Sequence, residues 1–354
     1  MEVQLGTEPT DRYLSFEVAR AARKLVEGVM LVKPGEYVLV TVDTAGDRRV
    51  AEAVAEAAYA AGAVPTLVVY HSSPTAVVEP PAPVAAAAAG ANVWIELAVA
   101  YVLHTQAYRN ALAAGCRYIC LTGMDVDMLV RCVGRVDYPA MLALGETLRR
   151  VVAAADEVRV TSPGGTDLIG YNRGRRVRHS GKLADTPGEP VMLGGQVSWC
   201  PVEETIEGRL VFDGALWPPM ELGRLSAPVE LDLSRGVVTG IRGGTEGQVF
   251  RRWLDSFGDP NMYRLAHYSL GFNPGVTRPT GRIVEDERVF GCIEMGIGAQ
   301  GVQIGGLTWS AASHTDGIVL SPSIYLDGEL LEVEGRYVHP EVVEACRRLG
   351  VSGY

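Results

Sequence analysis

The feature that most constrains the fold is a change near residue 156 in the pattern of apolar and helix-forming segments. Before it, helix-forming segments separate four short apolar runs of the kind that form buried strands, at 37–42, 65–70, 92–98 and 117–122. Strand and helix alternation at this spacing is typical of parallel βαβ units. We therefore expect a doubly wound, Rossmann- or flavodoxin-like α/β domain over residues 1–155.

After this point the sequence favours short strands broken by glycine. The strand-like runs lie at 158–161, 209–212, 229–233 and 301–304. Helices are expected near 244–257 and 340–349. With 354 residues, the chain exceeds the usual size of one domain. We expect residues 156–354 to form a second, α+β domain.

The charge balance excludes several classes of partner. The chain has 42 acidic and 32 basic residues, a net charge of −10, which argues against binding to nucleic acid or an anionic membrane. The densest basic cluster, at 173–178, is too short for a nucleic-acid footprint. The apolar stretch 82–103 is interrupted by Gly90, Asn92 and Glu96, so we interpret it as a helix followed by a buried strand, not a membrane span.

The six cysteines are scattered, and no two form a C-x-x-C pair. This pattern indicates free, buried thiols in a reducing compartment and argues against a cysteine-based zinc site. The first residues are acidic and polar and lack the layout of a signal peptide. We expect a cytoplasmic protein.

Glycine and histidine positions limit the kind of ligand site. No G-x-G-x-x-G follows the first strand, and no lysine follows the glycines near 271 and 296–301 with P-loop spacing. Neither a dinucleotide site nor a phosphate site is therefore supported, and close backbone packing explains these glycines better. Ligands of doubly wound sheets bind beyond the carboxyl ends of the strands. His104 follows the 92–98 run in such a position.

The segment 313–317 (SHTDG) carries the clearest chemical signal. In a strand, His314 and Asp316 project from one face and offer two metal ligands. His267 offers a third. Two histidines and one carboxylate are the ligands of non-haem Fe(II) oxygenases. The alternatives are a hydrogen-bonded strand surface for the H-x-D pair and a core position for His267.

Several segments together resemble one family of two-domain metalloenzymes. They are 161–168 (TSPGGTDL), 194–197 (GGQV), 201–203 (PVE), 208–214 (GRLVFDG), 267–274 (HYSLGFNP), 291–298 (GCIEMGIG) and 313–317. The family includes the 2,5-dihydroxypyridine 5,6-dioxygenases and the metalloaminopeptidases of the aminopeptidase T type. One short segment is weak support, but these occur in the family's order.

The aminopeptidase branch holds two metals with two glutamates, two histidines and an aspartate, next to a tyrosine. At four of these positions this chain has a different residue, namely Gln196, His267, Glu294 and Gly301. Only His314 and Asp316 match. A glutamine in place of a bridging carboxylate removes a charge that two neighbouring dications require. The resemblance therefore argues against a dinuclear peptidase site.

The dioxygenase branch resembles the chain better. It implies one Fe(II) held by His267, His314 and Asp316, and a base at His104, within a segment similar to the family's (VLHTQA, 102–107). We expect Glu294 and Gln196 to line the substrate site, with orientation of a ligand histidine as the alternative role for Glu294.

The leading hypothesis is a non-haem, extradiol-type dioxygenase that opens a hydroxylated pyridine. The resemblance implies O2 and 2,5-dihydroxypyridine as substrates, N-formylmaleamate as product, a role in nicotinate degradation, and a homo-oligomer. A metallo-aminopeptidase or other metal-dependent hydrolase is the first alternative. A metal-free homologue that retains only the fold is the second.

Overall fold

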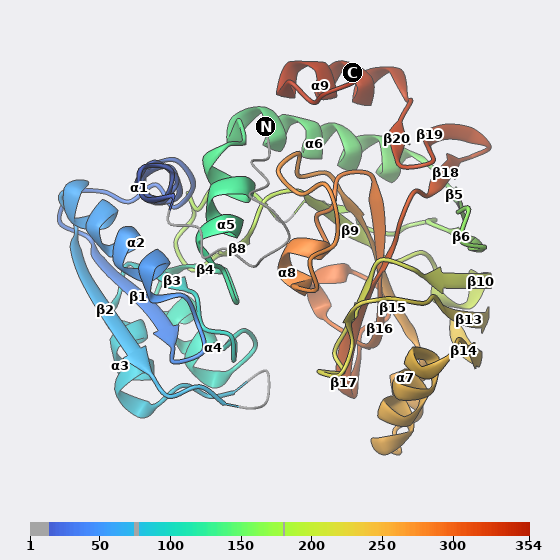
Figure 1. The fold of residues 1–354 in the computed structure, drawn as a ribbon, viewed down its shortest axis with the longest axis horizontal. Coiled ribbons are helices and arrows are strands. Elements are labelled where there is room, and N and C mark those ends of the chain that lie inside the picture. Colours follow the sequence, from blue (N-terminus) through green and yellow to red (C-terminus); the bar gives the residue numbers. More distant parts are fainter. Residues whose placement is uncertain (1–13, 74–77, 180) are drawn as a thin grey trace. The chain divides into compact units, whose positions relative to one another are not determined.

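The chain divides into two units, each with its own sheets. The computed structural model describes residues 14–73, 78–179 and 181–354. The first unit comprises the chain up to Arg135 together with Leu183–Met192, and the second comprises Val136–Lys182 and Leu193–Tyr354. Figure 1 traces the helices and strands of each unit.

The first unit is built on a parallel sheet of five strands in the order β2-β1-β3-β4-β8. These strands are β1 (Tyr37–Asp43), β2 (Val64–Tyr70), β3 (Val93–Glu96), β4 (Arg117–Cys120) and β8 (Pro190–Met192). The unit's helices are α1 (Ser15–Arg23), α2 (Arg48–Ala60), α3 (Ala82–Gly90), α4 (Gln106–Ala113) and α5 (Val126–Leu129), with π-helical turns at Lys24–Val29 and Val130–Gly134. This confirms the parallel α/β fold predicted from strand and helix alternation.

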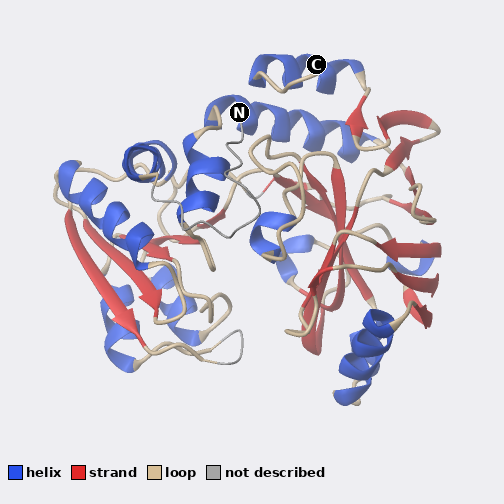
Figure 2. Ribbon diagram, viewed as in Figure 1, coloured by secondary structure: helices blue, strands red, loops and turns tan. Residues whose placement is uncertain are grey.

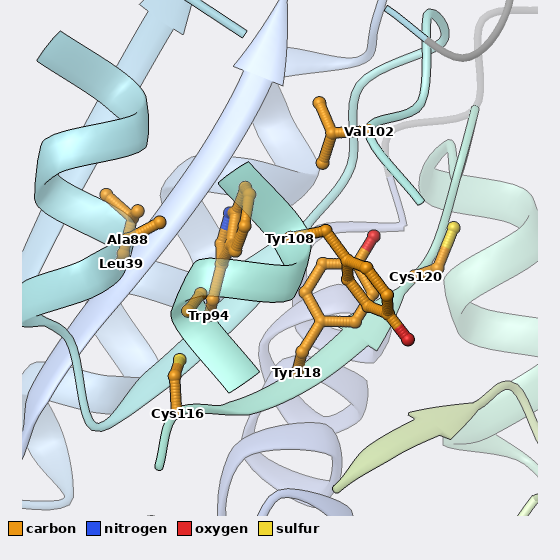
Figure 3. Close-up of a cluster of buried hydrophobic side chains, with 9 residues drawn as sticks. Leu39, Ala88, Trp94, Val102, Tyr108, Cys116, Tyr118 and Cys120 are labelled. Carbon is orange, nitrogen blue, oxygen red and sulfur yellow. The ribbon is translucent and has the colours of Figure 1, made fainter. Parts of the chain in front are cut away.

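Aromatic side chains pack together in the core of the first unit (Figure 3). The Tyr118 ring meets those of Trp94 and Tyr108 edge-on, at centroid distances of 5.1 and 5.0 Å. The Trp94 indole N–H donates to the Thr41 hydroxyl at 2.8 Å, which satisfies the one polar atom of that ring. These contacts fix β1, β3 and β4 to α4.

The second unit is rich in antiparallel strands (Figure 2). One sheet has the order β14-β13-β10-β6-β5-β18-β19-β20, and the other β12-β11-β17-β16-β15-β9-β7. The first is made of β5 (Glu157–Thr161), β6 (Asp167–Tyr171), β10 (Glu207–Phe212), β13 (Val229–Ser234), β14 (Val237–Arg242), β18 (Ser323–Leu326), β19 (Glu329–Val333) and β20 (Arg336–Tyr337). The second is made of β7 (Arg178–His179), β9 (Gln196–Trp199), β11 (Ala215–Trp217), β12 (Gly223–Arg224), β15 (Leu265–Gly271), β16 (Cys292–Gln300) and β17 (Trp309–Val319).

Four α-helices of the second unit accompany these sheets: α6 (Tyr138–Ala154), α7 (Thr245–Ser256), α8 (Ile283–Asp286) and α9 (Pro340–Leu349). Short 3-10 turns lie at Glu203–Thr205, Pro260–Tyr263 and Val302–Ile304. The helices expected near 244–257 and 340–349 are confirmed as α7 and α9, and with the antiparallel sheets they confirm an α+β second unit.

The prediction of a strand at 301–304 is wrong. Strand β16 ends at Gln300, and Val302–Ile304 is a 3-10 turn that leads back into β17. Gly305 has a left-handed backbone with φ 79°, which favours glycine and ends the turn. The Val302 side chain is 79% exposed, so the apolar run does not mark a buried strand.

The apolar stretch 82–103 contains α3 and β3, as expected. Across the described ranges, no helix has the length and apolar character needed to cross a membrane. The cysteines agree with their predicted state, because all six are free and buried.

Candidate metal centre

Three neighbouring strands bring the predicted ligands together. In the seven-stranded sheet, Gly296 of β16 pairs with His267 of β15 on one side and with Asp316 of β17 on the other. His314 pairs with Gly298, two residues further along β16. Strand residues two apart project from the same face. The register of the sheet therefore places His267, His314 and Asp316 on one face, although they are far apart in sequence.

The ligand atoms converge. One nitrogen from each histidine and one Asp316 oxygen all lie within 4.8 Å of one another. The Nε2 atoms of His314 and His267 are 2.8 and 3.5 Å from Asp316 Oδ1. The imidazole rings stack with centroids 5.2 Å apart and planes at 16°. This arrangement is suited to holding one small cation.

A backbone carbonyl fixes the orientation of one histidine. The Nδ1 atom of His314 is 2.8 Å from the Ala299 carbonyl oxygen. A carbonyl only accepts hydrogen bonds, so Nδ1 carries a proton, and Nε2, which faces Asp316, is the nitrogen that would bind an ion after losing its own proton. Such a contact from the outer nitrogen is typical of metal-binding histidines.

Gly296 provides the space for the two imidazoles. A Cβ atom at this position would lie 2.4 Å from His267 Cε1 and 2.7 Å from His314 Cε1. These distances are too short for any side chain to be accommodated without displacing both rings. The glycine is therefore needed by the site, and it explains part of the glycine-rich segment 291–298.

Burial and the charges of neighbouring groups shift the pKa values of the three side chains. Burial lowers the pKa of His267, and Asp316 opposes this effect. The pKa of His314 is raised because Asp316 outweighs the burial of the ring. Burial disfavours the charged form of Asp316, yet His314 and His267 hold the pKa of this carboxyl below its ordinary value. The aspartate is thus the anionic member of the set.

Two glutamates lie beside the cluster. The Oε2 atom of Glu294 is 3.1 Å from His267 Nε2, and the side chain is fully buried. Burial raises the pKa of Glu294, and Asp316 raises it further. Glu287, just after α8, interacts electrostatically with Asp316 and His267. The sequence pointed to Glu294 and to Gln196, which bonds both glutamates, but Glu287 was missed because it lies outside every motif.

His104 belongs to the first unit. It is exposed, directly precedes the Thr105 cap of α4, and has a left-handed backbone with φ 71°. This conformation is uncommon for a residue with a side chain, and such strain occurs preferentially at functional sites. Arg109 donates to the His104 carbonyl oxygen, and Glu79 accepts from the backbone amide of Ala107 at 3.2 Å. These contacts hold the turn that presents the imidazole.

The donor set fits a divalent transition metal. Two imidazole nitrogens and one carboxylate oxygen are the ligands that non-haem Fe(II) takes in oxygenases. Among the described residues, His267, His314 and Asp316 form the group of potential metal ligands whose atoms lie close enough to share one ion. Asp316 supplies charge, while two neutral imidazoles supply nitrogen donors.

Comparison with known proteins gives the family. The sequence model of the 2,5-dihydroxypyridine 5,6-dioxygenases matches residues 23–339. The chain belongs to the 2,5-dihydroxypyridine 5,6-dioxygenase family. A curated 2,5-dihydroxypyridine 5,6-dioxygenase from Pseudomonas putida (strain KT2440) is 27% identical over 252 residues, which cover 68% of this chain and 69% of that protein. The resemblance inferred from sequence segments is thereby confirmed.

Two solved structures resemble this chain in fold over most of its length. The 2,5-dihydroxypyridine dioxygenase from Pseudomonas putida KT2440 matches with a TM-score of 0.75 and 20% identity, over 92% of this chain and 98% of that one. Wild-type AmpT from Thermus thermophilus matches with a TM-score of 0.67 and 16% identity, over 92% of this chain and 100% of that one. At these identities the likeness concerns the fold alone.

Proposed function

We propose that this dioxygenase family member cleaves the ring of a hydroxylated pyridine, with 2,5-dihydroxypyridine as substrate and N-formylmaleamate as product. His267, His314 and Asp316 would hold a single Fe(II). The observation that carries the proposal is the convergence of these three side chains within 4.8 Å, in a chain whose family model covers residues 23–339.

The side chains around this centre have distinct parts in the proposal. Bound Fe(II) would supply a common binding place for O2 and the ring hydroxyl, together with one-electron chemistry. Asp316 offsets part of the ion's charge, and the Ala299 carbonyl keeps the His314 ring in its binding orientation. Glu294 borders the centre and would accept a hydrogen bond from the substrate, so we assign it to substrate binding.

His104 is the proposed base. A neutral imidazole takes up a proton near neutral pH. Removing the proton from the second ring hydroxyl would raise the electron density of the ring and favour its oxidation. The left-handed backbone at His104, held by Arg109, supports this role, as does the family resemblance of segment 102–107.

The decisive experiment combines metal analysis with oxygen uptake. The protein is purified without metal, loaded anaerobically with Fe(II), and mixed with 2,5-dihydroxypyridine in an oxygen electrode. We expect about one iron per chain, uptake of O2, and loss of the aromatic absorbance. Oxygen-independent cleavage of a leucine amide with zinc or manganese would instead establish a hydrolase. Cytoplasmic location and a homo-oligomeric state remain predictions, the latter measurable by light scattering.

A further inference from the structure

Gln196 uses both of its donor hydrogens within the protein. Its side chain, on β9, is only 7% exposed. The amide nitrogen is 3.1 Å from Glu287 Oε2 and 3.4 Å from Glu294 Oε2. An amide NH2 group has two hydrogens, so these two carboxylates occupy both. Gln196 therefore has no hydrogen left to donate to a substrate.

A buried arginine sets the orientation of this amide. Arg288 is 0% exposed, and its Nη2 donates to the Gln196 carbonyl oxygen at 3.4 Å. Its Nε and Nη1 donate to the Leu193 carbonyl and to Glu287 at 2.9 Å each. A guanidinium only donates, so Gln196 must turn its oxygen to Arg288 and its nitrogen to the two glutamates.

The bond to Glu294 acts on an oxygen that lies next to the centre. The same Oε2 that receives the Gln196 bond is 3.1 Å from His267 Nε2, the nitrogen that faces Asp316. A carboxylate oxygen is a strong ligand for a divalent cation. If Glu294 were unrestrained, a small rotation would allow it to join the three expected ligands and take a position needed by substrate or O2.

We propose that Gln196 is a positioning residue that restrains Glu294 and so prevents this carboxylate from becoming a fourth protein ligand. Glu287 and Arg288 anchor Gln196 for this purpose. The inference rests on the proposed metal-binding role of His267, His314 and Asp316. It deepens that role by naming the residues that keep part of the coordination sphere available to substrate.

The test is the coordination of Mn(II) in Gln196→Met, which keeps the side-chain length but removes both amide groups. Solvent-proton relaxation counts the water molecules bound to the ion without any turnover. In the variant, we expect about one fewer bound water and about tenfold tighter Mn(II) binding, as one more ligand joins the ion. With Fe(II), the KM for substrate should rise more than kcat falls. Adding Glu294→Gln to this variant should restore the water count, because the amide that replaces the carboxylate is a poor ligand for the ion.

Gln300→Met is the matched control. Gln300 is also buried, in the same sheet, and its amide nitrogen donates to Glu203 at 3.1 Å. We expect this control to lose stability without changing the bound water. Should Gln196→Met not fold, Gln196→Asn tests the same point, because its shorter side chain cannot reach both glutamates.

Two results would overturn the proposal. One is an unchanged water count in both Gln196 variants. The other is a tenfold or larger loss of Mn(II) affinity in Glu294→Gln alone, which would make Glu294 a ligand of the unaltered protein. Failure of the proposed metal site is distinguishable, since it would leave Mn(II) binding unaffected by His314→Ala. Failure of the proposed ring cleavage would show as absent O2 uptake, with the water counts as expected.

Discussion

The two units place polar groups on their sheets in different ways. In the first unit, Glu96 ends β3 at the carboxyl edge of the parallel sheet and accepts a hydrogen bond from the Tyr118 hydroxyl at 2.9 Å. His104 comes from the loop that follows. In the second unit, His267, Asp316 and their glycine partner lie within three antiparallel strands. One arrangement depends on loops, and the other on strand register.

This difference teaches where each kind of chemistry is held. Strand register fixes side chains through many backbone hydrogen bonds, which suits ligands that must keep fixed distances from an ion. A loop after a strand is easier to rearrange, which suits a group that gains and loses a proton. The comparison can be tested by separate substitutions in the two units.

The largest effect is expected from His314→Ala. Loss of one of three ligands should abolish iron binding and lower turnover by about a thousandfold or more, because the ion cannot be held. Iron content per chain and O2 uptake are the measurements. His71→Ala changes an exposed histidine outside the centre and should retain both. Full iron content in His314→Ala would show that the cluster of His267, His314 and Asp316 is not the metal site.

A different pattern is expected for His104→Ala. Removing a proton acceptor should lower kcat by about a hundred- to ten-thousandfold, while iron content stays unchanged. Added imidazole should restore part of the rate because the residue is exposed. Loss of iron in this variant would contradict the assignment of His104 as a base that is separate from the metal ligands on the strands.

Gly296→Ala tests the close packing under the ligands. The added methyl group would displace the His267 and His314 rings, so Fe(II) affinity should fall by about ten- to a hundredfold. Titration with Fe(II) under anaerobic conditions measures this change. Gly90→Ala is the control, since nothing lies within 4 Å of its added Cβ. Equal Fe(II) affinities in both variants would contradict the claim that Gly296 leaves the space that the two imidazole rings need.

The smallest effect on turnover is expected from Glu96→Gln, which acts on stability instead. Burial raises the pKa of Glu96 from 4.5 to about 8. The folded protein therefore keeps this carboxyl protonated where the unfolded chain ionises, and stability is lost as pH rises from about 4.5 to 8. Glutamine does not titrate, so the variant should gain roughly 3–5 kcal/mol relative to wild type across this range. Urea unfolding at the two ends of this pH range measures the change, and parallel pH profiles would contradict it.

The sequence predicted the parts of the molecule that depend on local pattern. The 37–42 and 65–70 runs became β1 and β2 because their β-branched, apolar residues fit a parallel sheet. His314 and Asp316 were found together because strand geometry alone puts them on one face. His267 was named as a third candidate ligand and the family resemblance supported it, but no local pattern indicates that β15 lies next to β16.

The remaining parts depend on long-range contacts that no local pattern contains. Glu287 reaches the centre because α8 is a single turn, fixed by the bonds of Asp286 to the backbone amides of Thr280 and Gly281. Arg288 can be buried because Glu287, Gln196 and two backbone carbonyls receive its hydrogens. The run at 301–304 was mispredicted because apolar residues in a connecting turn look like a strand.

The burial of every native thiol has a practical consequence. Burial also raises the pKa of the thiols of Cys116, Cys120, Cys200, Cys292 and Cys346, and protonated, inaccessible thiols react slowly with maleimides. A cysteine introduced at an exposed position can thus be labelled selectively without first removing the others. Pairs of such spin or fluorescent labels, one on each unit, would measure the distance between the units with and without substrate.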